Sequence, residues 1–237
     1  MANFYDFSSD KINVFYLLID SSGSMEDYEK DVIRGIREYK KSFENFPEVD
    51  SIAVSLSKFA NDFYPEYFTR VSEISEKYFA DGATALYYSI VRGAKHLEKY
   101  INDIVQEKKC VPRGTFIVFS DGKPYCDKAQ KSEAKKAIER LNMAGITTVF
   151  IAFGEAMESK FGKKLCFQST IDVNADKEIL ADFLGKELSK SCKEQSRSMK
   201  ALGANFFSQA ASNSNSVSGY SAKTEQALED NDWFEDI

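Results

Sequence analysis

The segment INVFYLLI, residues 12–19, is a continuous run of large apolar side chains, and DSSGS, residues 20–24, follows it directly. A continuous apolar run rich in β-formers is typical of a central strand covered on both faces. The next segment changes period, because large apolar side chains recur there at steps of three and four residues: Tyr28, Val32, Ile36, Tyr39, Phe43 and Phe46. This period predicts an amphipathic helix that ends near Pro47.

The alternation of strand and helix patterns continues along the chain. Further strand-like runs lie at 51–59, 114–121, 146–154 and 169–174, and 62–71, which contains a proline, reads as an edge strand or hairpin arm. Helical periods run from Thr84 to about 104 and over about 128–143, 156–165 and 175–192. This order predicts an α/β sandwich with a largely parallel sheet. In such sheets ligand sites gather at the carboxyl ends of strands, where Asp20 and Asp121 are expected.

The composition changes after residue 193, so we expect one domain over 1–193 and a tail over 194–237. The tail is rich in Ser and Asn and then acidic, and we expect it to be disordered or to fold on a partner. Its end, EDNDWFEDI (229–237), combines acids with Trp233 and Phe234. It is a solvated acidic end, a peptide that docks on a partner, or the source of a carboxylate for the protein's own metal.

Composition and charge exclude several classes of function. The net charge is −6, the isoelectric point is about 5.1 and no basic run stands out, so we expect no nucleic-acid partner. The four cysteines are widely spaced and predict reduced thiols rather than a zinc site or disulfides. The N-terminus has no basic region and no apolar span, so we expect no signal peptide, no membrane segment and a cytoplasmic location.

The loop at 20–24 admits four interpretations: a helix cap, a catalytic nucleophile, a phosphate cradle or a set of hard-oxygen metal ligands. A cap explains one hydroxyl but not the alternation of Asp20, Ser22 and Ser24, which in an extended loop points all three side chains the same way. A phosphatase of the haloacid-dehalogenase kind needs a second carboxylate where Ser22 stands. A serine hydrolase needs a base, and the only histidine, His96, lies within the second helix. No glycine-rich phosphate loop is present.

Metal binding remains as the main interpretation of this loop. Hydroxyl and carboxylate oxygens suit a hard divalent cation such as Mg²⁺. Asp20, Ser22 and Ser24 supply three oxygens, and two further candidates stand at element ends, Thr84 in DGATAL (81–86) and Asp121 in VFSDGKP (118–124).

These three motifs, in this order, resemble the metal-ion-dependent adhesion site of the von Willebrand factor A domain family, and the resemblance covers roughly residues 12–192. It implies a Rossmann-like three-layer sandwich, with a mainly parallel central sheet, one antiparallel edge strand and helices on both faces. It also implies that Ser22, Ser24 and Thr84 coordinate through hydroxyls, and that Asp20 and Asp121 ligate directly or through water. One departure is Ala83 beside Gly82, where the family often has two glycines; Ala fits only at negative φ.

The resemblance further implies a protein-interaction module rather than an enzyme. Its Mg²⁺ (Mn²⁺ or Ca²⁺ are alternatives) would be completed by an Asp or Glu of a partner protein. The intracellular microbial members are the most similar, which suggests a cytosolic stress, tellurite-resistance or defence-type assembly. The alternative function is a metal-dependent phosphohydrolase that uses the Asp20 loop.

Overall fold

The computed structural model describes residues 11–122, 124–125, 129–154, 156–157, 160–173, 177–197 and 220–223. Its strands are β1 (Asn13–Asp20), β2 (Ile52–Phe59), β3 (Phe63–Tyr64), β4 (Arg113–Ser120), β5 (Thr147–Ala152), β6 (Ser169–Val173) and β7 (Tyr220–Lys223). They form one sheet in the order β3-β2-β1-β4-β5-β6-β7. The strands from β2 to β6 in this order are parallel, and β3 and β7 pair antiparallel at the two edges.

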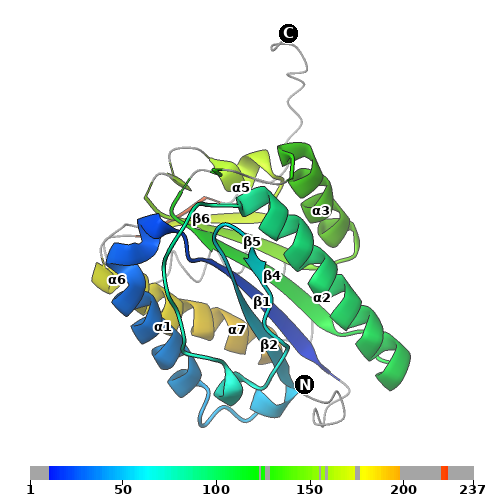
Figure 1. Cartoon of the computed structure of the whole chain (residues 1–237). Helices are drawn as coiled ribbons and strands as arrows, with labels where there is room; N and C mark the ends of the chain where they lie inside the picture. Colours follow the sequence, from blue (N-terminus) through cyan, green and yellow to red (C-terminus); the bar gives the residue numbers. More distant parts are fainter. Residues whose placement is uncertain are drawn as a thin grey trace.

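Helices cover both faces of the sheet, as Figure 1 shows. The α-helices are α1 (Glu29–Ser42), α2 (Leu86–Lys108), α3 (Lys131–Met143), α5 (Phe161–Lys164), α6 (Lys177–Asp182) and α7 (Leu188–Arg197), and a π-helical turn, η5 (Phe183–Glu187), joins α6 to α7. Short 3₁₀ turns are η2 (Gly23–Tyr28), η3 (Val49–Ser51) and η4 (Val71–Glu73). The predicted α/β sandwich is therefore confirmed, and the structure adds β7 as a second antiparallel strand.

The alternation of side chains along β1 divides the core into two layers. Phe15, Leu17 and Ile19 pack under α1, α6 and α7, whereas Val14, Tyr16 and Leu18 pack under α2 and α3. All eight residues of β1 are buried, as expected for a strand with helices on both sides. The run at residues 12–19 thus forms the centre of the molecule, and its last residue, Asp20, reaches the edge of the sheet.

Regular structure continues beyond residue 193, where the composition changes and where the sequence analysis ends the domain. Helix α7 continues to Arg197, and the side chain of Gln195 is buried, where its Nε2 donates a 2.8 Å hydrogen bond to Oγ1 of Thr115 in β4. Residues 220–223 form β7. Trp233 and Phe234 lie outside the described residues.

None of the described helices is both long and apolar enough to cross a membrane. The three cysteines in the described part of the chain, Cys110, Cys166 and Cys192, form no disulfide.

Candidate metal centre

The predicted site residues meet at one edge of the sheet because their strands are parallel neighbours. Strands β1 and β4 pair in parallel, so Asp20 at the end of β1 lies beside the end of β4, after which Asp121 follows. Thr84 stands two residues before α2, in the segment that crosses the same edge. Asp20, Ser22, Thr84 and Asp121 are buried, whereas Ser24 is exposed, so the cluster opens to solvent at Ser24.

Hydrogen bonds connect the hydroxyl and carboxylate oxygens of this cluster. The Oγ atoms of Ser22 and Ser24 lie 3.1 Å apart, and Ser24 Oγ donates a 3.0 Å bond to Oδ1 of Asp121. The hydroxyl of Thr84 faces the same space. A methyl group placed on Gly122 would lie 3.8 Å from Ser24 Oγ and 3.9 Å from Thr84 Oγ1. The structure thus brings all five predicted residues to one place.

The Asp20 carboxylate is fully buried and is held at both oxygens. Its Oδ1 accepts a 2.9 Å hydrogen bond from the backbone N–H of Ser22, and its Oδ2 accepts a 2.6 Å bond from Ser120 Oγ. Burial, and to a smaller extent the nearby charge of Asp121, raises the pKa of Asp20, while the bonds from Ser120 and Ser22 lower it, and the net pKa is about 7. A positive charge close by would favour the ionised form of Asp20.

The helix-cap interpretation of the serines fails on geometry. Ser22 is the residue that precedes η2, but its side chain makes no capping hydrogen bond. The expectation of an extended loop through Ser24 is also wrong, because η2 begins at Gly23. The 3₁₀ turn, rather than an extended alternation, brings the Ser24 hydroxyl back to that of Ser22.

Backbone contacts fix the loop before α2 against the β1 loop. The N–H of Gly23 donates to the carbonyl of Gly82 at 2.8 Å, and the N–H of Asp81 donates to the carbonyl of Ser21 at 2.9 Å. Gly82 has φ +85°, which favours glycine. Ala83 does not share this conformation, so the departure from a glycine pair is accommodated as the sequence requires.

Two supporting residues escape the sequence analysis, Ser120 and Tyr78. Tyr78 donates a 2.5 Å hydrogen bond from its hydroxyl to the backbone carbonyl of Asp20, and burial raises its pKa. Of the two, only Ser120 could be found from the sequence, because it is a hydroxyl residue at the end of an apolar strand, as in the loop that follows β1. The position of Tyr78 depends on a long connection that has no regular period.

Two polar residues considered in the sequence analysis, Ser21 and His96, have structural explanations. Ser21, next to the cluster, donates its hydroxyl to the carbonyl of Phe59 at 3.0 Å and so ties β1 to β2. The ring of His96 lies 3.3 Å from the hydroxyl of the buried Tyr16 and stacks edge-on against Phe68, and burial lowers its pKa. His96 thus belongs to the interior packing of α2.

The donor set fits a hard divalent cation. Three hydroxyls and two carboxylates converge, and the more deeply buried carboxylate, Asp20, is unfavourable in its charged form without a counter-charge. Within the described residues no group of three or more His, Cys, Asp or Glu side chains could hold a metal. A soft or borderline metal held by His and Cys therefore finds no site in that part of the chain.

The sequence matches no family profile and no curated protein. Its fold, however, is similar to that of solved structures. The pilus adhesin SpaC of Lactobacillus rhamnosus GG superposes with a TM-score of 0.60 at 12% identity, over 78% of this chain and 31% of the adhesin. This chain therefore spans about a third of the adhesin's length.

Two smaller structures show the same fold. The VWA domain of SpRpn10 has a TM-score of 0.50 at 16% identity, over 73% of this chain and 94% of the domain. The manganese-loaded TRAP protein of Plasmodium vivax has a TM-score of 0.50 at 19% identity, with 74% of each chain covered. The chain has the von Willebrand factor A fold, and the resemblance first seen in its three motifs extends to the whole sandwich.

Proposed function

We propose that this chain is a protein-interaction module that depends on a divalent cation. Asp20, Ser22, Ser24, Thr84 and Asp121 would hold Mg²⁺, or alternatively Mn²⁺ or Ca²⁺, and a partner protein would present an Asp or Glu to it. The observation that carries this proposal is the buried Asp20 carboxylate beside the hydrogen-bonded Ser22, Ser24 and Asp121 oxygens. A bound cation supplies a positively charged acceptor for a carboxylate.

The residues of this chain prepare that acceptor. Ser120 and the Ser22 N–H hold Asp20 in one orientation, and Ser24 connects the β1 loop to Asp121. Such supporting bonds orient ligands and tune their affinity. Ser24 is exposed, so a partner can approach the site from the surface at Ser24, next to the oxygens of Ser22 and Asp121 to which it is hydrogen-bonded.

A groove of about 510 Å³ lies next to this cluster, and the exposed aromatic side chains in its lining support a protein partner. Its lining includes Ser21, Asn61 and Asp81 from the site loops and the exposed aromatic rings of Tyr64 and Phe79. Phe79 is 71% exposed, yet its neighbours are fixed: Tyr78 is bonded to Asp20, and the N–H of Ala80 donates to Glu29 Oε2 at 3.1 Å. Aromatic side chains are enriched at the centres of protein–protein interfaces.

The competing function is an enzyme, a metal-dependent phosphohydrolase that uses the Asp20 loop. Against it, both Asp20 oxygens accept internal hydrogen bonds and the side chain is inaccessible to solvent. His96, the chain's only histidine, is half-buried, with its ring 3.3 Å from the Tyr16 hydroxyl. These observations support a binding role. Hydrolysis of simple phosphoesters that depends on both Mg²⁺ and Asp20 would instead support the phosphohydrolase.

As the setting we propose a cytosolic assembly of the stress, tellurite-resistance or defence kind. Only the resemblance to intracellular microbial members supports this setting.

The proposal is tested by capture of partners from the native cell extract, with and without EDTA, on immobilised wild-type chain and on its Thr84→Val variant. Thr84→Val removes a hydroxyl but keeps the shape. Ser21→Ala is the matched control for the metal site: Ser21 borders the groove, but it is only 4% exposed and its hydroxyl donates to the Phe59 carbonyl, so the change removes no candidate ligand and almost no groove surface. We expect EDTA and Thr84→Val each to abolish the same captured protein, and Ser21→Ala to retain it. Capture that survives both treatments contradicts a metal bridge.

A further inference from the structure

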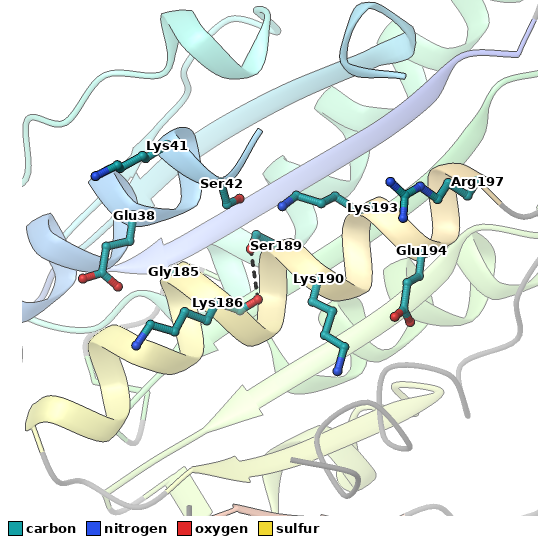
Figure 2. A pocket seen from close by; sticks show the side chains of 10 residues that line it. All are labelled: Glu38, Lys41, Ser42, Gly185, Lys186, Ser189, Lys190, Lys193, Glu194 and Arg197. Carbon is teal, nitrogen blue, oxygen red and sulfur yellow. Dashed lines mark hydrogen bonds between the residues drawn. The ribbon is translucent and has the colours of Figure 1, made fainter. Parts of the chain in front are cut away.

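A second groove lies away from the metal centre, between α1 and α7, with a volume of about 550 Å³ (Figure 2). Five of the ten side chains that line it are cationic and two are acidic: Lys41, Lys186, Lys190, Lys193 and Arg197 against Glu38 and Glu194. Four of the cations follow the helix at steps of four, three and four residues, from Lys186 to Arg197. This spacing places them along one stripe of the helix.

Packing fixes two of these cations at the groove. The ammonium of Lys193 lies 5.1 Å from the centre of the Phe43 ring, and the guanidinium of Arg197 lies 5.0 Å from that of Phe46. In Figure 2 the side chain of Lys193 extends toward Ser42 of α1. Cation–π contacts of this kind attract the two charges to the aromatic rings that follow the end of α1.

The positive charges of the groove are only partly neutralised. Lys186 pairs with Asp182 at 2.9 Å, and Arg197 lies 3.8 Å from Glu48. Within the described residues, no ion pair joins Lys41, Lys190 or Lys193 to a carboxylate. Burial lowers the pKa of Lys193, and the like charge of Arg197 lowers it further. A negatively charged occupant would relieve this repulsion.

The two sides of the groove come close together at Gly185, one of its lining residues. Gly185 lies in the π turn η5, and a methyl group added there would come within 2.6 Å of Glu38 Cβ. The two helices therefore approach closely below an open, charged rim. Such a shape suits an extended peptide better than a compact small molecule.

The chain itself contains a peptide of the complementary charge. Residues 224–237 hold six of its 37 acidic residues and none of its 31 Lys and Arg, so this segment accounts for the whole net charge of −6. We propose that residues 224–237 of this chain dock in the groove between α1 and α7. The inference is independent of the metal centre and of the function proposed for it.

The length of the segment and the position of its first residue allow this contact. Ala222 of β7 pairs with Ile171 of β6, and Ile171 lines a small cavity together with Phe183 and Leu188 of the η5–α7 helix. The end of β7 is thus one strand and one helix away from the groove. Fourteen residues span up to roughly 45 Å when extended, which exceeds the roughly 10 Å diameter of a helix several times.

Trp233 is the only tryptophan of the chain, so its emission reports directly on this segment. In the full chain we expect its anisotropy at low salt to exceed the value in 1 M NaCl, where the screening length falls to about 3 Å and the docked segment is released. The emission should shift to the red on this release. Equal anisotropy and equal emission at low and at high salt would overturn the proposal.

Charge reversal separates the groove from the rest of the surface. Lys41→Glu with Lys190→Glu changes two exposed groove cations, and we expect loss of the high anisotropy. Lys131→Glu with Lys136→Glu, at exposed positions of α3, adds the same charge on the other face of the sheet and should leave it unchanged. Glu229→Lys with Asp230→Lys should restore docking in the groove variant. Equal effects of the two reversals would contradict the groove.

Two further readouts identify the occupied site. Release of Trp233 by EDTA rather than by salt would place the segment on the metal centre and overturn the groove assignment. Anisotropy that rises with protein concentration would assign the peptide to a second copy and would likewise overturn it. We expect neither effect.

Discussion

Ser120 Oγ donates a 2.6 Å hydrogen bond to Oδ2 of Asp20, a residue one hundred positions earlier in the chain. The bond exists because β1 and β4 are parallel neighbours that end at the same edge of the sheet. It supplies one of the two donors that hold the buried Asp20 carboxylate. A residue outside the five candidate ligands thus orients the Asp20 carboxylate of the candidate metal centre.

Ser120→Ala leaves Oδ2 of Asp20 buried without its donor. We expect the free energy of unfolding to fall by about 1–3 kcal/mol and Mn²⁺ affinity to fall about 10- to 100-fold. Urea denaturation and Mn²⁺ titration measure the two effects. The control is Ser55→Ala, which removes a buried hydroxyl bonded to the Glu66 carbonyl at 2.8 Å. It should lower stability but leave the Mn²⁺ affinity unchanged, and a similar loss of affinity in both variants would contradict the role of Ser120.

Asp20 makes the stability of the metal-free chain depend on pH. Its pKa in the folded state, about 7, lies above the ordinary value of 3.8. Between these values the folded state keeps a proton that the unfolded state has lost. The free energy of unfolding should therefore fall as pH rises from about 4 to about 7, by on the order of a few kcal/mol at most.

Urea denaturation in EDTA at pH 5 and pH 8 measures this dependence. Asp20→Asn should reduce the difference between the two pH values, because it removes the titrating group. With Mn²⁺ present, affinity should rise over the same range, since protons and the cation compete for the carboxylate. An unchanged pH dependence in Asp20→Asn would show that another group is responsible.

Gly82→Ala combines a strained backbone with a steric overlap. Gly82 has φ +85°, and an added methyl group would overlap the side-chain amide of Asn61, whose Oδ1 accepts the Ala83 N–H at 2.7 Å. Gly145→Ala is the matched control, because Gly145 has φ +74° but no atom within 4 Å of the added group. We expect Gly145→Ala to cost about 1 kcal/mol of stability.

Gly82→Ala should cost more than Gly145→Ala and should also weaken Mn²⁺ binding, because the loop displaced by Asn61 carries Thr84. Urea denaturation and Mn²⁺ titration of the two variants provide the comparison. If both variants lose the same stability and neither loses affinity, the Gly82 loop does not shape the metal centre.

Phe79→Ala tests the surface next to the metal centre. We expect the affinity for the captured partner to fall by about 2 kcal/mol or more, with stability unchanged, because an exposed ring contributes little to folding. Met143→Ala, at an 88% exposed apolar residue at the end of α3, is the control and should leave the affinity unchanged. Surface plasmon resonance with the captured partner gives both numbers, and equal affinities for the two variants would remove Phe79 from the interface.

The sequence alone predicts the layers of the fold because strand and helix periods are local. The sequence also predicts that Asp20, Ser22, Ser24, Thr84 and Asp121 lie at one edge of the sheet, because the carboxyl ends of parallel strands meet there. What it misses depends on contacts between distant segments. Tyr78 reaches Asp20 through a connection without a regular period. The 3₁₀ turn after Ser22 begins at Gly23, whose N–H donates to the carbonyl of the distant Gly82. The pairing of β7 with β6 arises from a stretch whose composition resembles a tail.

The central claim is that five oxygen donors from three segments hold one divalent cation. Isothermal titration of the chain with MnCl₂, compared with Thr84→Val and Ser21→Ala, tests it most directly. We predict one site per chain in the wild type and in Ser21→Ala, and at least tenfold weaker binding in Thr84→Val. No saturable binding in the wild type, or equal binding in all three proteins, would contradict the account.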